Sequence, residues 1–125
     1  MSLDESLARA CEAVPGLLRA ALALLPEGLL IGSIGAKGAL EHEPLVRTAK
    51  RCFEAPRAAP RAEPFVEFVF VTEDQFIAIQ AGRQDARLAL IVACSREATL
   101  GYVLDATRKA MRSLEQSVDL ARLGV

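Results

Sequence analysis

Three apolar segments between residues 65 and 94 constrain the fold of this chain more than any other feature of its sequence. Phe65–Val71 is short, β-branched and aromatic, and Gln75–Ala81 and Arg87–Cys94 follow it after short polar connections. Such segments are typical of β-strands, and their short connections predict a three-strand meander. Because the strands are apolar on both faces, the sheet needs cover on both sides, and helices are the available cover.

The first part of the chain predicts a helix followed by a hairpin. Residues Leu3–Val14 place apolar side chains at helical spacing, and Pro15-Gly16 ends the pattern. The apolar runs Leu17–Leu25 and Leu29–Ile34 flank a Pro-Glu-Gly turn, which predicts a β-hairpin. The leucines and alanines of the first run suit a helix equally well, so a helix stays an alternative for this segment.

A second helix is expected from Pro44 to Glu54, because proline is favoured in the first turn of a helix. The helix is followed by the proline-rich segment Ala55–Pro64, which predicts a loop. Five residues form the apolar face of this helix: Leu45, Val46, Ala49, Cys52 and Phe53.

A long final helix is expected after a cap at Ser95. Its apolar residues recur at spacings of three and four, as in a coiled-coil seam, but packing on the sheet is the favoured interpretation in a small domain. The stripe comprises Leu100, Leu104, Thr107, Met111, Leu114, Val118 and Ala121. The whole order is αββαβββα, an α/β class of α+β type, in one domain spanning residues 1–125.

Composition limits the classes of function. The chain has 125 residues, 52% of them hydrophobic, which suits one domain with apolar surface to spare for another protein. Its 15 Lys and Arg against 16 Asp and Glu do not form the basic surface expected of a nucleic-acid-binding protein. No segment is apolar enough to span a membrane and the first residues lack a basic signal region, so we expect a cytoplasmic protein.

The sequence predicts no catalytic residue, metal site or cofactor. Cys11, Cys52 and Cys94 are spaced for neither disulfides nor paired metal ligands and are expected to be buried. The glycine-rich segment 32–38 lacks the spacing of a phosphate-binding loop. His42 has no second histidine with which to bind a metal or activate a nucleophile, and it is expected at a solvated helix start.

Two surfaces are candidates for recognition. Arg47, Lys50 and Arg51 share one side of the second helix and form a basic stripe, for which a plain solvated surface is an equal alternative. The strand Phe65–Val71 would aggregate at a sheet edge unless a partner strand covered it.

The arrangement resembles the roadblock (dynein light chain) family over nearly the whole chain. The resemblance rests on the initial helix that ends at Val14-Pro15-Gly16, the Glu27-Gly28 turn where the family often has Asp-Gly, the strand Phe65–Val71, and the strand Ala89–Val92 that leads into a long helix.

The resemblance implies a roadblock/profilin-like fold and a dimer. The expected fold is a five-stranded antiparallel sheet with the first and last helices on one face and the middle helix on the other. Members typically dimerise through middle helices and third strands. On this chain the dimer seam would include Leu45, Val46, Ala49, Cys52, Phe53, Phe65, Val66, Glu67, Phe68 and Phe70.

The resemblance also implies a partner. Dimers of this family are platforms for Ras-like small GTPases, and they include bacterial gliding-motility regulators that raise GTP hydrolysis by their partner. The GTPase-facing surface would centre on Glu43, Arg47, Lys50 and Arg51.

The hypothesis is therefore a non-catalytic dimeric interaction module that regulates a Ras-like small GTPase. The alternative is a homodimeric scaffold without a GTPase partner. An arginine finger at Arg47 or Arg51 is not adopted, because the family shares no such finger. A ligand sensor is less favoured, because the sequence shows no convergent polar groups. Whether the partner is a second copy or a different subunit, and whether hydrolysis or exchange is affected, stays open.

Overall fold

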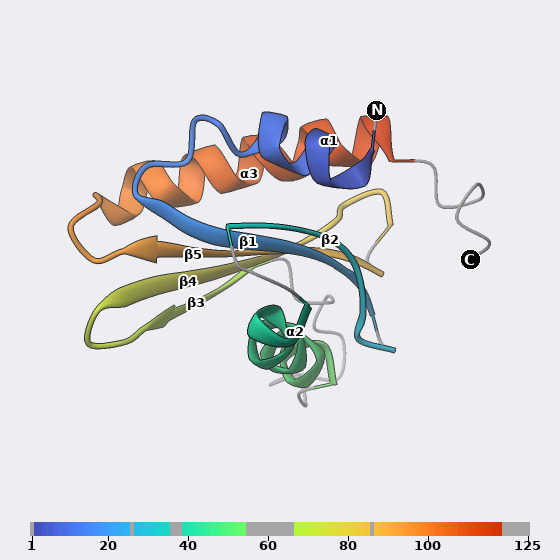
Figure 1. Cartoon of the computed structure of the whole chain (residues 1–125), viewed down its shortest axis with the longest axis horizontal. Helices are drawn as coiled ribbons and strands as arrows, with labels where there is room; N and C mark the ends of the chain where they lie inside the picture. The colour runs from blue at the N-terminus through green and yellow to red at the C-terminus, as the bar shows by residue number, and fades with distance from the viewer. Residues whose placement is uncertain (1, 26, 36–38, 55–66, 86, 119–125) are drawn as a thin grey trace.

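The fold is a five-stranded sheet between two layers of helices (Figure 1). The computed structural model describes residues 2–25, 27–35, 39–54, 67–85 and 87–118, with the backbone alone at 39–41 and 53. The elements are α1 (Leu3–Ala10), β1 (Leu17–Leu24), β2 (Leu29–Ile34), α2 (Ala39–Glu54), β3 (Glu67–Val71), β4 (Gln75–Ala81), β5 (Leu88–Ser95) and α3 (Leu100–Ser117). This order confirms the predicted αββαβββα arrangement.

All neighbouring strands pair antiparallel, in the order β2-β1-β5-β4-β3. The predicted meander of β3, β4 and β5 and the predicted hairpin of β1 and β2 are both confirmed. Strand β1 forms despite its helix-forming residues because it pairs on both sides, with β2 and β5, and residues Ala20–Leu24 are buried. Tertiary burial here outweighs local propensity.

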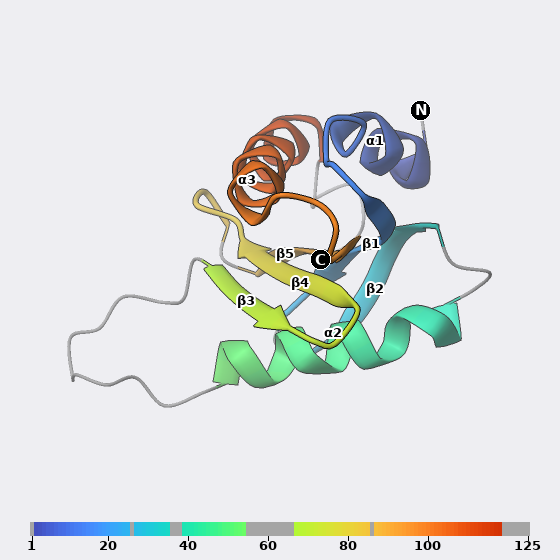
Figure 2. The same ribbon diagram turned by 90° about the vertical axis from the view of Figure 1, so that its left-hand side faces the viewer.

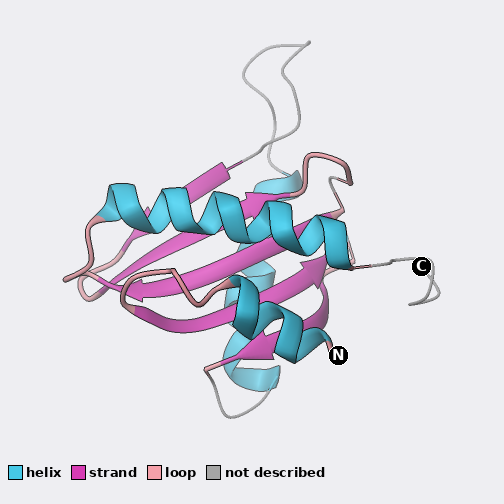
Figure 3. Cartoon of the chain, turned by 90° about the horizontal axis from the view of Figure 1, so that it is seen from above, coloured by secondary structure: helices cyan, strands magenta, loops and turns pink. Residues whose placement is uncertain are grey.

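Helices α1 and α3 cover one face of the sheet and α2 covers the other (Figure 2). Seen from above, α1 and α3 lie side by side across the strands (Figure 3). Alternate residues of β1 and β5 therefore enter two separate apolar cores. Leu22 and Leu90 contact the α1 and α3 layer, and Ala21 and Ile91 contact α2.

Helix α1 is shorter than expected. It ends at Ala10 rather than Val14, and Cys11 is its C-cap. At its other end the backbone N–H of Glu5 donates to the hydroxyl of the N-cap residue Ser2 at 3.1 Å. Although Val14 lies outside the helix, it is buried in the same core as Leu7.

Helix α2 begins five residues before the expected Pro44. Starting at Ala39, it contains Pro44 in its interior, where the ring leaves the Leu40 carbonyl without its usual donor. Only one backbone hydrogen bond near the first turns is lost. The prediction from Pro44 was therefore wrong for the helix start and right for its end at Glu54.

Helix α3 starts at Leu100 with Thr99 as its N-cap, so the predicted cap at Ser95 was wrong. Ser95 is instead the last residue of β5, and its hydroxyl accepts from the backbone N–H of Glu97 at 3.2 Å. The side chains of Thr107, Met111 and Leu114 are buried against α1 and the sheet. Packing on the sheet, rather than a coiled-coil seam, explains this part of the stripe.

Candidate interaction surfaces

The predicted partner-facing residues lie together on the exposed side of α2. Arg47 lies four residues after Glu43, three before Lys50 and four before Arg51, which places all four on one side of the helix. Arg47 and Glu43 form an ion pair at 3.0 Å, with side chains that are 59% and 55% exposed. Neither Lys50 nor Arg51 forms an ion pair with a carboxylate among the described residues. The stripe therefore carries two cations that no carboxylate of the described residues neutralises in an ion pair.

The opposite side of α2 is used by the chain itself. The residues expected at a dimer seam here, Leu45, Val46, Ala49 and Cys52, are between 0% and 8% exposed and contact the sheet residues Ile79 and Ile91, among others. They hold α2 on the sheet, and only the flanks and outer side of the helix are open to a second molecule. The side chain of Phe53 lies outside the described residues.

His42 is buried, so its expected place at a solvated helix start was wrong. Because α2 begins at Ala39, His42 lies within the helix and precedes Leu45, Val46 and Ala49 by three, four and seven residues. These spacings put its side chain on the buried side of the helix, where it has no exposed surface.

The three cysteines have the character of buried apolar side chains, as the sequence predicted. Burial raises the pKa of Cys11 and of Cys94 to about 11, with the proximity of Cys94 adding to the shift at Cys11. Burial also raises the pKa of Cys52. A thiol that stays protonated is a poor nucleophile.

Strand β3 places two phenylalanine side chains on the face of the sheet that α2 covers. Phe68 and Phe70 lie on this face, their rings stacked with centroids 6.4 Å apart, and Phe70 is 37% exposed. Phe68 and Ile77 contact the core beneath α2. Phe65 and Val66, the first two residues of the predicted strand, lie outside the described residues.

The side chain of Glu67, also on β3, points to the opposite face of the sheet, which α3 covers. Its carboxylate lies on the α3 face and accepts two hydrogen bonds from the Arg108 guanidinium, each of 2.8 Å. Sequence analysis missed this contact between β3 and α3, because nothing local links residues that are 41 positions apart. The only signal was the pair of arginines at 108 and 112, one helical turn apart.

No group of His, Cys, Asp and Glu side chains able to hold a metal ion occurs in the described part of the chain. Among its helices, none is long and apolar enough to cross a membrane.

The fold matches solved Roadblock/LC7 domains. A Roadblock/LC7 domain from Streptomyces avermitilis superposes with a TM-score of 0.77 at 16% identity, over 94% of this chain and 98% of that one. MglB from Myxococcus xanthus gives 0.74 at 16% identity, over 90% and 91%. The gliding protein MglB from Thermus thermophilus gives 0.72 at 18% identity, over 90% and 88%. No family model matches the sequence, and no curated protein does.

Proposed function

We propose that this chain, which has the fold of Roadblock/LC7 domains, is a non-catalytic homodimeric module that binds and regulates a Ras-like small GTPase. The observation that carries the proposal is the shared fold with MglB over nine-tenths of each chain, combined with a charged stripe on the exposed side of α2. The family resemblance supports a partner of this kind at this helix.

The dimer would form along β3. Its outer edge has no strand beside it among the described residues, and a strand of a second copy would satisfy its unpaired backbone groups. Phe70 beside this edge is 37% exposed and would be covered at the same time. Because Leu45, Val46, Ala49 and Cys52 already contact their own sheet, they would support such a seam by fixing α2 in place beside it.

The GTPase would bind the stripe Glu43, Arg47, Lys50 and Arg51. Lys50 and Arg51 can pair with acidic side chains of a partner without first breaking an ion pair. The exposed Arg47–Glu43 pair contributes little to stability, so Arg47 can exchange its partner at small cost.

The test is a binding assay with the small GTPases of the same organism, each loaded with GDP or with a non-hydrolysable GTP analogue. We expect one GTPase to bind in a nucleotide-dependent manner. The double variant Arg47→Glu, Arg51→Glu should weaken that binding about tenfold or more. A matched control, Arg9→Glu with Lys109→Glu, makes the same change of charge on α1 and α3 and should leave binding unchanged.

Two results would contradict the proposal. If no GTPase binds in either nucleotide state while the chain dimerises, the scaffold alternative is correct. If binding survives the α2 variant but fails in the control variant, the stripe has been assigned to the wrong face. A GTP hydrolysis assay on the complex then shows whether the regulation acts on hydrolysis.

A further inference from the structure

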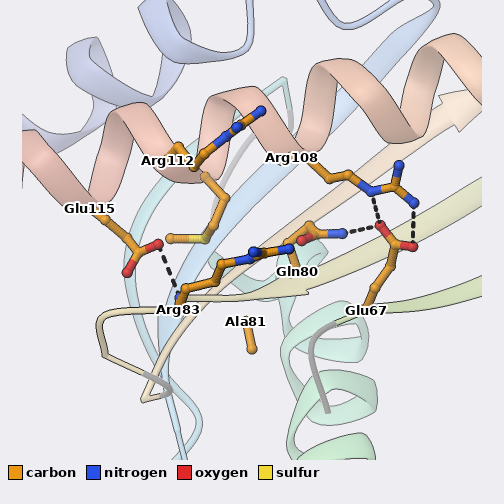
Figure 4. A pocket seen from close by; sticks show the side chains of 8 residues that line it. Glu67, Gln80, Ala81, Arg83, Arg108, Arg112 and Glu115 are labelled. Atoms are coloured by element: carbon orange, nitrogen blue, oxygen red, sulfur yellow. Dashed lines mark hydrogen bonds and ion pairs between the residues drawn. The ribbon is translucent and has the colours of Figure 1, made fainter.

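A polar pocket lies on the face of the sheet opposite α2, where α3 passes over the ends of β3 and β4 (Figure 4). Its volume is about 400 Å³, within the usual range for sites of small molecules. The charged and polar residues that line it are Glu67, Gln80, Arg83, Arg108, Arg112 and Glu115. They come from β3, β4, the β4–β5 turn and α3, so the fold brings together polar groups that sequence analysis did not expect to converge.

Both carboxylates of the pocket are already engaged. Glu67 accepts two hydrogen bonds from Arg108 and a further one from the Gln80 amide. Glu115 accepts from three consecutive backbone N–H groups of the β4–β5 turn, those of Arg83 at 3.1 Å, Gln84 at 2.7 Å and Asp85 at 3.4 Å. These bonds fix the turn against α3.

Two arginines of the pocket, Arg83 and Arg112, are not paired with either of these carboxylates. The guanidinium groups of Arg83 and Arg112 form no ion pair with any carboxylate among residues 2–118 that the structure describes. Figure 4 shows Arg83 extending from the turn towards Gln80, whereas the Arg112 side chain runs along α3 with its guanidinium turned away from Arg83. Because Glu115 clamps the backbone of Arg83, this arginine is placed more firmly than a residue of a free surface loop.

The chemistry of these groups specifies a ligand. A guanidinium is a planar fork that matches carboxylate and phosphate oxygens. Met111 on α3 adds an apolar side chain to the lining of the pocket, which favours a ligand with a carbon framework over a bare inorganic ion. The geometry points to this pocket as a binding site for a small organic oxyanion, held by Arg83 through a phosphate or carboxylate group, with Arg112 adding positive charge at the rim of the pocket.

The inference is independent of the proposed function. The pocket lies beneath α3, on the other face of the sheet from the α2 stripe. It can therefore be tested on the isolated chain, without a GTPase and without nucleotide.

The experiment is an NMR titration of the full chain with inorganic pyrophosphate and, separately, with citrate, at constant ionic strength. We expect saturable shifts of the backbone amides of Arg83, Gln84 and Arg112 with at least one of the two probes. Saturation by pyrophosphate alone assigns a phosphorylated ligand, and saturation by citrate alone assigns a carboxylate ligand. Either result supports the inference.

The double variant Arg83→Gln, Arg112→Gln should weaken binding of the effective probe about tenfold or more. The matched control is Arg9→Gln with Lys109→Gln, which removes the same charge from exposed positions outside the pocket and should leave the affinity unchanged. Thermal unfolding of both variants verifies that they are folded. Equal losses in the two variants, shifts confined to other regions, or no saturable shift with either probe would overturn the inference.

Discussion

The two edge strands of the sheet, β2 and β3, differ in how far other parts of the chain cover them. At β2, helix α1 lies alongside the strand, and the backbone N–H of Ser33 donates to the Asp4 carboxylate at 2.9 Å. At β3, the described residues form backbone pairs with β4 alone.

The difference favours β3 as the edge at which the proposed dimer would form. An uncovered edge exposes a row of donors and acceptors that recruits further strands. At β2, helix α1 hinders the addition of a further strand, and the pairing of β1 with β2 has an irregular register between Leu22 and Ala23. At β3 it leaves Phe70 and Val71 exposed, at 37% and 56%. Because both edges belong to one sheet, the contrast between them favours assembly at β3 over unspecific association at either edge.

The largest effect is expected at the end of the covered edge. Gly35 follows β2 with a φ of +87°, and a Cβ there would lie 2.4 Å from the Leu18 carbonyl oxygen and 2.8 Å from the Arg19 Cα. Gly35→Ala should lower the free energy of unfolding by about 3 kcal/mol, because backbone strain and a backbone clash add together. Urea unfolding monitored by circular dichroism measures the loss.

Gly101 provides the control for this substitution. It lies in the first turn of α3, and a Cβ added there would meet no atom of the described residues within 4 Å. Gly101→Ala should therefore raise stability, by about 0.5–1 kcal/mol, through helix propensity alone. If the two variants lost equal stability, the geometry described for Gly35 would be wrong.

The next largest effect concerns the open edge. Phe70→Glu places a charge beside β3 and should raise the dissociation constant of the dimer about thirtyfold or more, equivalent to roughly 2 kcal/mol. Light scattering and sedimentation at several concentrations measure the change. The substitution should affect the fold of the monomer less, since Phe70 is already partly exposed.

Leu29→Glu is the matched control at the covered edge. Leu29 begins β2 and is 51% exposed, so the same charge is introduced at the other end of the sheet. Its effect on assembly should be negligible. A dimer that dissociates in Leu29→Glu and persists in Phe70→Glu would reverse the assignment of the two edges.

The sequence predicted most of the fold because each element carried its own signal. Strand β4 was predicted with the observed bounds, and β2 likewise, because turn residues flank both. The start of α2 was missed because Pro44 is a strong local signal for a helix start, whereas burial of His42 depends on the sheet beneath it.

The surfaces were less predictable than the fold. Helical spacing placed Arg47, Lys50 and Arg51 together on α2, since that relation is local. The cover of β2 by Asp4 and the ion pair of Glu67 with Arg108 join residues 29 and 41 positions apart. Such contacts depend on strand order, which the sequence pattern does not encode by itself.

A smaller effect on stability is expected at raised pH, from two buried thiols in the core between the sheet and helices α1 and α3. Cys11 caps α1, and both it and Cys94 are buried with pKa values raised to about 11. In the unfolded chain these thiols lose their protons near pH 9.0, so the folded chain binds more protons between about pH 9 and 11. Stability should therefore fall as pH rises through this window, by about 1 kcal/mol for each thiol at about pH 10.

Urea unfolding at pH 8, 9 and 10 measures this slope in the parent chain and in the double variant Cys11→Ala, Cys94→Ala. The variant should be less stable at pH 8, because two buried side chains are shortened, and its stability should depend less on pH. An unchanged slope would show that other groups cause the alkaline loss. Cys52→Ala, on the opposite face, is the control and should flatten the slope less, since only the α1 layer holds two adjacent thiols among the described residues.

The smallest effect tests the contact that covers β2. Asp4→Ala removes the acceptor for the Ser33 N–H and a negative charge from the first turn of α1, and should lower stability by about 1 kcal/mol. Glu5→Ala removes a charge from the same turn without touching β2, so the difference between the two variants isolates the edge contact. Hydrogen exchange at Ser33 should quicken in Asp4→Ala alone. Equal stability and equal exchange in both variants would mean that Asp4 does not protect the edge, and that the helix covers β2 through apolar packing instead.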